Sequence, residues 1–187
     1  ESEQTQAESE AAAARRGAGL FRLPGRGLIR VSGPDRVRWL NGMLSNDVAA
    51  LVAGPQRSGC AALLLTPKGA IVADLNVLLF SSCGEKGDEI WLELAREAVA
   101  KVSERLQRYI VADDVVLADA SGEWEQLSLE GPASTGVLAD AMASDLGLAP
   151  GAGVRARIAN EAVVAAAFGF SGGPAFRLFV AAGAGDR

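Results

Sequence analysis

The sequence lacks histidine altogether and contains two cysteines and 5% aromatic residues in 187 residues. Without histidine, this chain cannot form a Ser-His-Asp triad, a Cys-His dyad or a histidine-based metal site. Cys60 and Cys83 form no CxxC motif, so a paired zinc or redox motif is absent and a disulfide framework is not expected. We predict two buried, reduced cysteines and no metal site.

The sequence also lacks a basic excess and a long apolar run. The formal net charge is −5, which argues against nucleic acid or an anionic membrane as the main partner. No run reaches the length of a membrane span. The chain opens with Glu1 and shows no signal-peptide pattern, so we expect an incomplete or processed N-terminus. These features predict a cytoplasmic protein without nucleic-acid or membrane partners.

The first nineteen residues differ in composition from the rest. Residues 1–19 are polar, then alanine-rich, and close with the letters RRGAG. They carry no apolar stripe with which a helix could dock. We therefore expect a disordered tail over residues 1–19. The chain as a whole is 49% hydrophobic, enough for a folded domain, which we expect over residues 20–187.

Residues 63–80, LLLTPKGAIVADLNVLLF, are the most informative stretch. Proline fixes φ and glycine permits positive φ, so residues 66–69 predict a tight turn between strands over residues 59–65 and 70–80. The near-continuous apolar content of both arms is typical of strands buried on both faces.

The second arm places one carboxylate and one amide on an apolar face. With a period of two, this face carries Val72, Asp74, Asn76, Leu78 and Phe80. A half-buried carboxylate needs a partner or a shifted pKa. Asp74 is therefore a candidate functional residue, and the structural alternative is an ion pair with a local arginine or hydrogen bonds from backbone N–H groups.

Hydrophobic periodicity predicts the remaining elements. We expect helices from about residue 34 to 44 and over 96–109 and 133–146, and strands over 28–31, 90–94, 115–118, 124–129, 154–158, 162–170 and 175–181. This order predicts an α+β fold of antiparallel sheets with flanking helices. Within it, residues 90–158 match a ferredoxin-like β-α-β-β-α-β unit. Asn46 and Asp47 follow the first helix, either as its structural terminus or as a ligand-contacting loop.

Three segments in order resemble the N-terminal half of the glycine-cleavage T-protein superfamily. They are VSGPDRVRWLNGMLSNDV at 31–48, LLLTPKGAIVADLNVLL at 63–79 and LSLEGPAS at 127–134. The superfamily comprises tetrahydrofolate-dependent aminomethyltransferases and YgfZ-type relatives. The TPKG turn lacks the paired glycines common in true T-proteins and so resembles the YgfZ branch more. That branch is implicated in maintaining iron–sulfur enzymes through a folate-dependent step.

The resemblance implies a folate site around Asp74. In the family the equivalent aspartate lies near the reactive nitrogens of the folate, where it can orient the cofactor, assist proton movement and stabilise a cationic centre. Asn76, Leu78 and the turn from Leu44 to Asn46 would line the cleft. Ala61 and Leu78 stand where family members often place aromatic rings, and neither can stack on a ring.

The resemblance also bounds the function. The signature KGCYxGQE and the family's second half are not in these residues, so we expect an N-terminal portion or a degenerate member. The main hypothesis is a tetrahydrofolate-binding, YgfZ-like protein that supports iron–sulfur client proteins. The alternatives are a glycine-cleavage aminomethyltransferase acting with a lipoyl carrier protein, and a non-catalytic scaffold that has lost the folate pocket.

Overall fold

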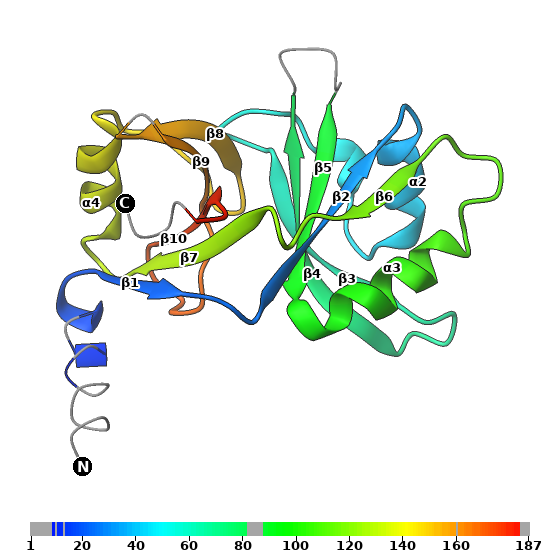
Figure 1. The fold of residues 1–187 in the computed structure, drawn as a ribbon, viewed down its shortest axis with the longest axis horizontal. Coiled ribbons are helices and arrows are strands. Elements are labelled where there is room, and N and C mark those ends of the chain that lie inside the picture. Colours follow the sequence, from blue (N-terminus) through cyan, green and yellow to red (C-terminus); the bar gives the residue numbers. More distant parts are fainter. Residues whose placement is uncertain (1–8, 10, 13, 82–87, 160, 184–187) are drawn as a thin grey trace.

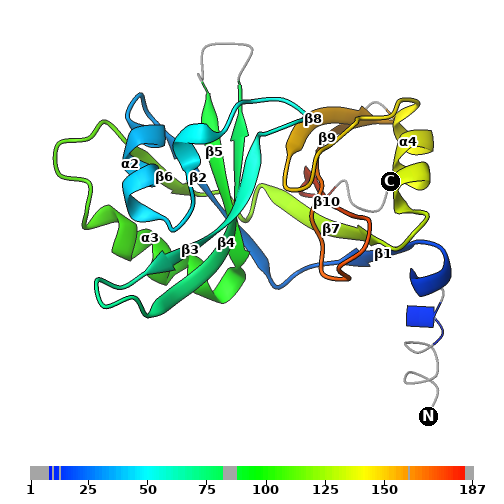
Figure 2. The same cartoon turned by 180° about the vertical axis from the view of Figure 1, so that it is seen from behind.

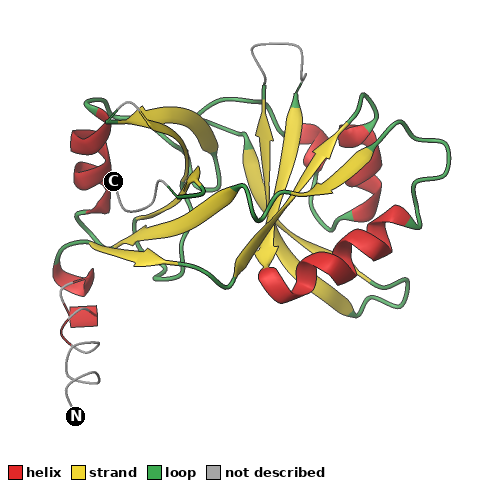
Figure 3. Ribbon diagram, in the orientation of Figure 1, coloured by secondary structure: helices red, strands yellow, loops and turns green. Residues whose placement is uncertain are grey.

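The computed structural model describes residues 9, 11–12, 14–81, 88–159 and 161–183. Two five-stranded antiparallel sheets lie side by side, and helices cover the outer side of each (Figures 1 and 3). The view from behind shows the same division into two halves (Figure 2). This arrangement confirms the expected α+β class with antiparallel sheets and flanking helices.

Sheet B, the larger half, has the strand order β3-β4-β5-β2-β6. Its strands are β2 (Arg26–Ser32), β3 (Gly59–Leu65), β4 (Ile71–Phe80), β5 (Glu89–Ala95) and β6 (Val116–Asp119). The helices α2 (Arg36–Met43) and α3 (Val99–Gln107) cover one face, with the 3-10 turns η1 (Val48–Ala50) and η2 (Arg96–Ala98). Leu40 and Val102, both fully buried, pack there with Val77.

Sheet A has the strand order β1-β7-β10-β9-β8. Its strands are β1 (Gly19–Arg22), β7 (Trp124–Glu130), β8 (Gly153–Ile158), β9 (Glu161–Ala166) and β10 (Ala175–Ala181). The helix α4 (Ser134–Met142) covers the outer face, where Leu138 packs with Leu129 and Leu178.

An aromatic cluster joins the inner faces of the two sheets. The Trp91 ring of β5 lies 5.4 Å from the Phe179 ring of β10, between ring centroids, and 4.9 Å from the Trp124 ring of β7. Phe80 and Leu78 complete the contact from β4. Burial of these side chains is the main apolar contribution that holds sheet A against sheet B.

The prediction of a ferredoxin-like unit over residues 90–158 is wrong. Its strands divide between the sheets, because β5 and β6 belong to sheet B whereas β7 and β8 belong to sheet A. The crossing occurs at Ala120, which is fully buried between the sheets and whose N–H donates to the Leu28 carbonyl. The order of strands and helices along the sequence does not show which strands pair, so it could not reveal this division.

Part of the expected tail is folded against sheet A. Residues 14–16 are helical, Gly19 begins β1, and the Ala133 N–H donates to the Gly17 carbonyl. Gly131, at φ +115°, permits a close approach, since a Cβ there would lie 2.2 Å from the Ala14 carbonyl oxygen. Residues 1–8, 10 and 13 lie outside the described residues. The first and third helices are also shorter than expected.

Candidate ligand site between the two sheets

A buried carboxylate, Glu93 of β5, is the centre of the polar contacts between the sheets. Its Oε1 accepts hydrogen bonds from Arg26 Nε and from Arg177 Nη1, both at 2.6 Å. Its Oε2 accepts from Arg26 Nη2 and from Asn76 Nδ2, both at 2.8 Å. Glu93 and Arg177 are 0% and 1% exposed. Such a burial of charge is tolerated because the carboxylate is paired and hydrogen-bonded through both oxygens.

Strand pairing places these groups together. Asn76 of β4 and Leu28 of β2 lie directly opposite Glu93, and Arg26 lies two residues before Leu28 on the same face. Arg177 belongs to β10 and reaches Glu93 from sheet A, with Gln126 Oε1 at 3.4 Å from its Nη1. The cluster therefore joins three strands of sheet B to two strands of sheet A.

The two arginines experience opposite electrostatic effects. Burial lowers the pKa of the Arg26 guanidinium, but hydrogen bonds and charge from Glu93, and the charge of Asp74, outweigh it and raise that pKa. Burial is the largest effect on Arg177 and, with the charge of Arg26, holds its pKa below the ordinary value against the attraction of Glu93. Both guanidinium groups remain protonated at neutral pH.

Asp74 is exposed, which corrects the expectation of a half-buried carboxylate in an apolar face. Sheet A covers only the second half of β4, where Leu78 and Phe80 are buried, and leaves the half that carries Asp74 open. Among the described residues, no side chain or backbone N–H donates a hydrogen bond to the Asp74 carboxylate. Its charge instead acts on Arg26 nearby. Asn76 lies beside it on the same face and is partly exposed.

The structure does not bring the other predicted residues to this place. Leu78 is fully buried in the aromatic cluster, and Leu44 packs on the opposite face of sheet B among the helices. The Asn46 amide Nδ2 donates to the Ala61 carbonyl at 2.8 Å, and Asp47 Oδ1 accepts from the Ala50 N–H. The helix α2 ends before them, with Leu44 as its C-cap, and Asp47 is the N-cap of η1. Asn46 and Asp47 thus make structural hydrogen bonds in the turn after α2, but they are not the terminus of that helix.

A second carboxylate fixes the loop that follows β9. Glu130 accepts hydrogen bonds from Ser128 Oγ at 2.5 Å and from the N–H groups of Phe170 and Ser171 at 3.0 and 3.1 Å. Burial raises the pKa of Glu130, but these donors outweigh it and lower that pKa. The loop places the Phe170 ring 4.7 Å from the Arg177 guanidinium carbon.

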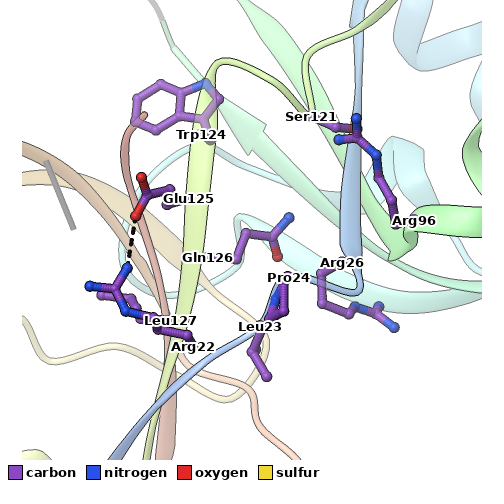
Figure 4. Close-up of a pocket in the computed structure, with 10 residues that line it drawn as sticks. All are labelled: Arg22, Leu23, Pro24, Arg26, Arg96, Ser121, Trp124, Glu125, Gln126 and Leu127. Atoms are coloured by element: carbon purple, nitrogen blue, oxygen red, sulfur yellow. Dashed lines mark hydrogen bonds and ion pairs between the residues drawn. The ribbon is translucent and has the colours of Figure 1, made fainter. Parts of the chain in front are cut away.

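A cavity of about 310 Å³ adjoins the cluster at the β1–β2 connection. Arg26 and Gln126 line it, whereas Asp74 does not. Figure 4 shows Arg22 and Arg96 on opposite sides of this cavity, with Arg22 paired to Glu125 at 3.1 Å. The exposed carboxylate and the cavity are therefore separate features that share Arg26 as a neighbour.

Sequence reasoning missed Glu93 and Arg177. Both carry the signal that singled out Asp74, an ionisable residue within an apolar strand, in the stretches IWLELA and AFRLFVA. The pattern reports which residues lie on a strand, but it does not report which of them meet across two sheets.

Three other expectations concern metals, membranes and thiols. Within the described ranges, no group of three metal-ligating side chains is close enough to hold an ion. No helix in that part of the chain is long and apolar enough to cross a membrane. Cys60 is half-buried and free, and its pKa is raised by burial and by the charge of Asp47, while Cys83 lies outside the described residues.

Comparison with known proteins agrees with this architecture. The chain is 29% identical over 170 residues to an aminomethyltransferase of Saccharopolyspora erythraea, covering 89% of this chain and 44% of that protein. It is 30% identical to the aminomethyltransferase of Streptomyces avermitilis, covering 90% of this chain and 43% of that protein. The chain thus spans less than half the length of these relatives.

The chain also matches a solved structure and a protein-family model. The glycine cleavage system aminomethyltransferase T of Bartonella henselae superposes with a TM-score of 0.74 at 23% identity, covering 92% of this chain and 44% of that one. That likeness shows the fold. The family model for the GCVT N-terminal domain matches residues 1–187, the whole chain. The chain therefore belongs to the GCVT N-terminal domain family.

Proposed function

We propose that this chain is the N-terminal part of a cytoplasmic, tetrahydrofolate-dependent aminomethyltransferase that acts with a lipoyl carrier protein. The names of the relatives support this function over the YgfZ-type function that the TPKG turn suggested. The observation that carries the proposal is the exposed Asp74 carboxylate. Among the described residues it accepts no hydrogen bond, while the neighbouring Glu93 is fully satisfied.

The polar groups on this face fit a folate, whereas the expected apolar lining does not. A reduced pterin ring presents N–H donors, which a carboxylate and an amide oxygen can accept. Asp74 and Asn76 would hold it, and Leu78 and Leu44 would not touch it because they are buried within the core of the domain. Ala61, exposed opposite Asn76, leaves room on this face without adding a ring.

The chemistry assigned to Asp74 follows from its position. When bound, tetrahydrofolate supplies the nitrogens that accept the one-carbon unit. An ionised carboxylate can orient these nitrogens by accepting hydrogen bonds, and it can take up or return a proton there. Arg26 contributes a positive charge nearby, and the charge of Asp74 is among the effects that raise the pKa of the Arg26 guanidinium.

An assay of the complete gene product tests this function. We expect formation of methylene-tetrahydrofolate from an aminomethylated lipoyl carrier protein, and a loss of at least a hundredfold in kcat/KM for Asp74→Ala. A matched variant, Asp145→Ala, removes an exposed carboxylate that bonds the Gly147 N–H in another loop and should retain activity. Equal activity of the wild-type protein and Asp74→Ala would refute the role of Asp74.

A second candidate function is the YgfZ-type support of iron–sulfur proteins. It is favoured by the turn after β3, which contains the single glycine Gly69 at φ +81°. The absence of an aromatic side chain at Ala61 and Leu78 favours instead a non-catalytic scaffold that has lost the folate pocket. Absence of methylene-tetrahydrofolate formation, together with restored iron–sulfur enzyme activity in a strain lacking the gene, would favour this candidate. Absence of both, without folate binding, would favour a scaffold.

A further inference from the structure

The cavity of about 310 Å³ at the β1–β2 connection is positively charged. Three of the side chains that line it are arginines, namely Arg22, Arg26 and Arg96 (Figure 4). Glu125 is the one carboxylate in this lining, and it pairs with Arg22. The chain as a whole carries a net charge of −5. A concave surface whose charge is opposite to that of the rest of the protein attracts ligands of the other sign, which here are anions.

The guanidinium group of Arg96 has no partner in the part of the chain that the structure describes. The Arg96 backbone N–H donates to the Gly25 carbonyl, which fixes this residue at the start of η2, but its side chain is exposed and makes no hydrogen bond or ion pair there. Burial raises the pKa of the nearby Asp119 carboxyl, but hydrogen bonds from Ser121, with a smaller contribution from the charge of Arg96, outweigh it and lower that pKa. Asp119 is thus bonded to Ser121, and the N–H groups of Arg96 remain available to a ligand.

Arg26 also keeps one nitrogen available at this cavity. Its Nε and Nη2 donate to Glu93, whereas its Nη1 donates to no described residue. Nη1 is not among the polar atoms that are sealed from solvent without a partner, so a ligand can reach it. Guanidinium groups present paired N–H groups that match the geometry of a carboxylate. Arg96 and Arg26 Nη1 therefore favour a ligand that carries carboxylates.

The strand register gives the separation between this cavity and Asp74. Arg26 of β2 lies opposite Ala95 of β5, and the β4–β5 register, continued by two residues, brings Asp74 level with Ala95 on the other side. Neighbouring strands are about 4.8 Å apart, so the Cα atoms of Asp74 and Arg26 are separated by roughly 10 Å. Arg96 follows Ala95 directly in the chain and lines the cavity.

We propose that this cavity binds the glutamate carboxylates of the folate, with Arg96 and Arg26 Nη1 as donors, while the nitrogens that accept the one-carbon unit lie at Asp74. The inference deepens the proposed function and rests on it for the identity of the ligand. In tetrahydrofolate a benzoyl ring and an amide bond separate these nitrogens from the glutamate, a length comparable to the two strand spacings between Asp74 and Arg26. The cavity volume is at the lower end for ligand pockets, so it suits a part of the folate rather than the whole molecule.

The test is a calorimetric titration of the complete gene product with three probes. They are tetrahydrofolate, 6-methyltetrahydropterin, which lacks the glutamate, and 4-aminobenzoylglutamate, which lacks the pterin. We expect Arg96→Ala to weaken the binding of tetrahydrofolate and of 4-aminobenzoylglutamate about tenfold and to leave the affinity for the pterin unchanged. Because the side chain is exposed, the substitution should not prevent folding. Higher ionic strength should weaken the wild type's affinity for 4-aminobenzoylglutamate more than its affinity for the pterin, since salt screens charge.

Arg57→Ala is the matched control. Arg57 is also exposed, but it pairs with Val52 in the turn after η1 and does not line this cavity. This variant should bind all three probes as the wild type does. Arg26 is not substituted, because its loss would also remove a partner of the buried Glu93.

The outcomes separate this inference from the proposed function. Loss of tetrahydrofolate binding in Asp74→Ala with unchanged affinities in Arg96→Ala would overturn the anion site and leave the folate function standing. If 4-aminobenzoylglutamate binds in a manner that depends on Arg96, while tetrahydrofolate and the pterin do not bind, the anion site stands and the folate function fails. Glutarate, a free dicarboxylate, distinguishes the source of the carboxylates: its binding through Arg96, with tetrahydrofolate unaffected by Arg96→Ala, would overturn the assignment to the folate. Absence of binding for every probe overturns both.

Discussion

The Arg177 guanidinium of β10 lies 2.6 Å from the Glu93 carboxylate of β5, and this bond crosses from one sheet to the other in a nearly dry environment. It belongs to the same network that orients Asn76 beside Asp74. The contact between the sheets and the geometry of the candidate site therefore depend on one carboxylate. A change at Glu93 is expected to affect both folding stability and the orientation of the Asn76 side chain.

Removal of the Glu93 charge should be costly for folding. Glu93→Gln preserves the shape but leaves Arg177, which is 1% exposed, without its carboxylate. We expect the free energy of unfolding in urea to fall by about 3 kcal/mol or more, the range found when one partner of a buried ion pair is removed.

The matched control is an exposed ion pair of the same chemistry. Glu123 binds Arg30 at 2.8 Å, but half of its side chain is exposed. Glu123→Gln should cost less than about 1 kcal/mol, because water screens and replaces that interaction. Comparable losses in the two variants would show that the Glu93 cluster is not a buried, mutually dependent network.

Glu130 predicts a pH dependence of stability. Its pKa is lowered in the folded state by Ser128 and by the Phe170 and Ser171 N–H groups, which outweigh burial. A lowered folded-state pKa stabilises the protein above the unfolded-state pKa, and this stabilisation disappears as pH falls through the folded-state value. We expect Glu130→Gln to be less stable than wild type by about 1–2 kcal/mol at pH 7. Thermal unfolding should show the two converging below about pH 4. If the difference in stability between the wild type and Glu130→Gln did not change with pH, the hydrogen bonds to the ionised Glu130 carboxylate would not be stabilising the fold.

Leu78 distinguishes a core residue from a ligand-lining residue. The side chain is fully buried between the sheets with Trp91 and Phe179. We expect Leu78→Ala to lower the free energy of unfolding by about 2–5 kcal/mol through loss of apolar burial and an unfilled cavity. The dissociation constant of the folded variant for tetrahydrofolate should match that of the wild type. If Leu78→Ala instead had unchanged stability and bound tetrahydrofolate ten times more weakly than the wild type, Leu78 would be a ligand-lining residue.

Much of the fold could be predicted from local pattern. The hairpin of β3 and β4, with its turn at residues 66–69, follows from two apolar runs around proline and glycine. Alternate residues of β4 pack on opposite faces of the sheet, as a period of two predicts. The strands β7 to β10 were likewise predictable from alternation and turn residues. By contrast, β1 consists of the letters GLFR, too short and too mixed to mark a strand.

The candidate site was predictable only in part, for a physical reason. Asp74 and Asn76 were found because they interrupt one apolar strand, which is local information. Glu93 and Arg177 interrupt strands that are 84 residues apart in the chain, and their pairing depends on how sheet A meets sheet B. The exposure of Asp74 depends on the same packing, since sheet A stops short of the first half of β4.

The central claim is that Asp74 is the ligand-binding carboxylate. Calorimetry tests it most directly, by measuring the affinity of the complete gene product for tetrahydrofolate in the wild type and in Asp74→Asn. The substitution removes the charge and keeps the size of an exposed side chain, so the melting temperature should stay within about 2 °C. We predict clear binding by the wild type and at least tenfold weaker binding by Asp74→Asn. Equal dissociation constants for the two proteins, or no binding by either, would contradict the assignment of Asp74 as the ligand-binding carboxylate.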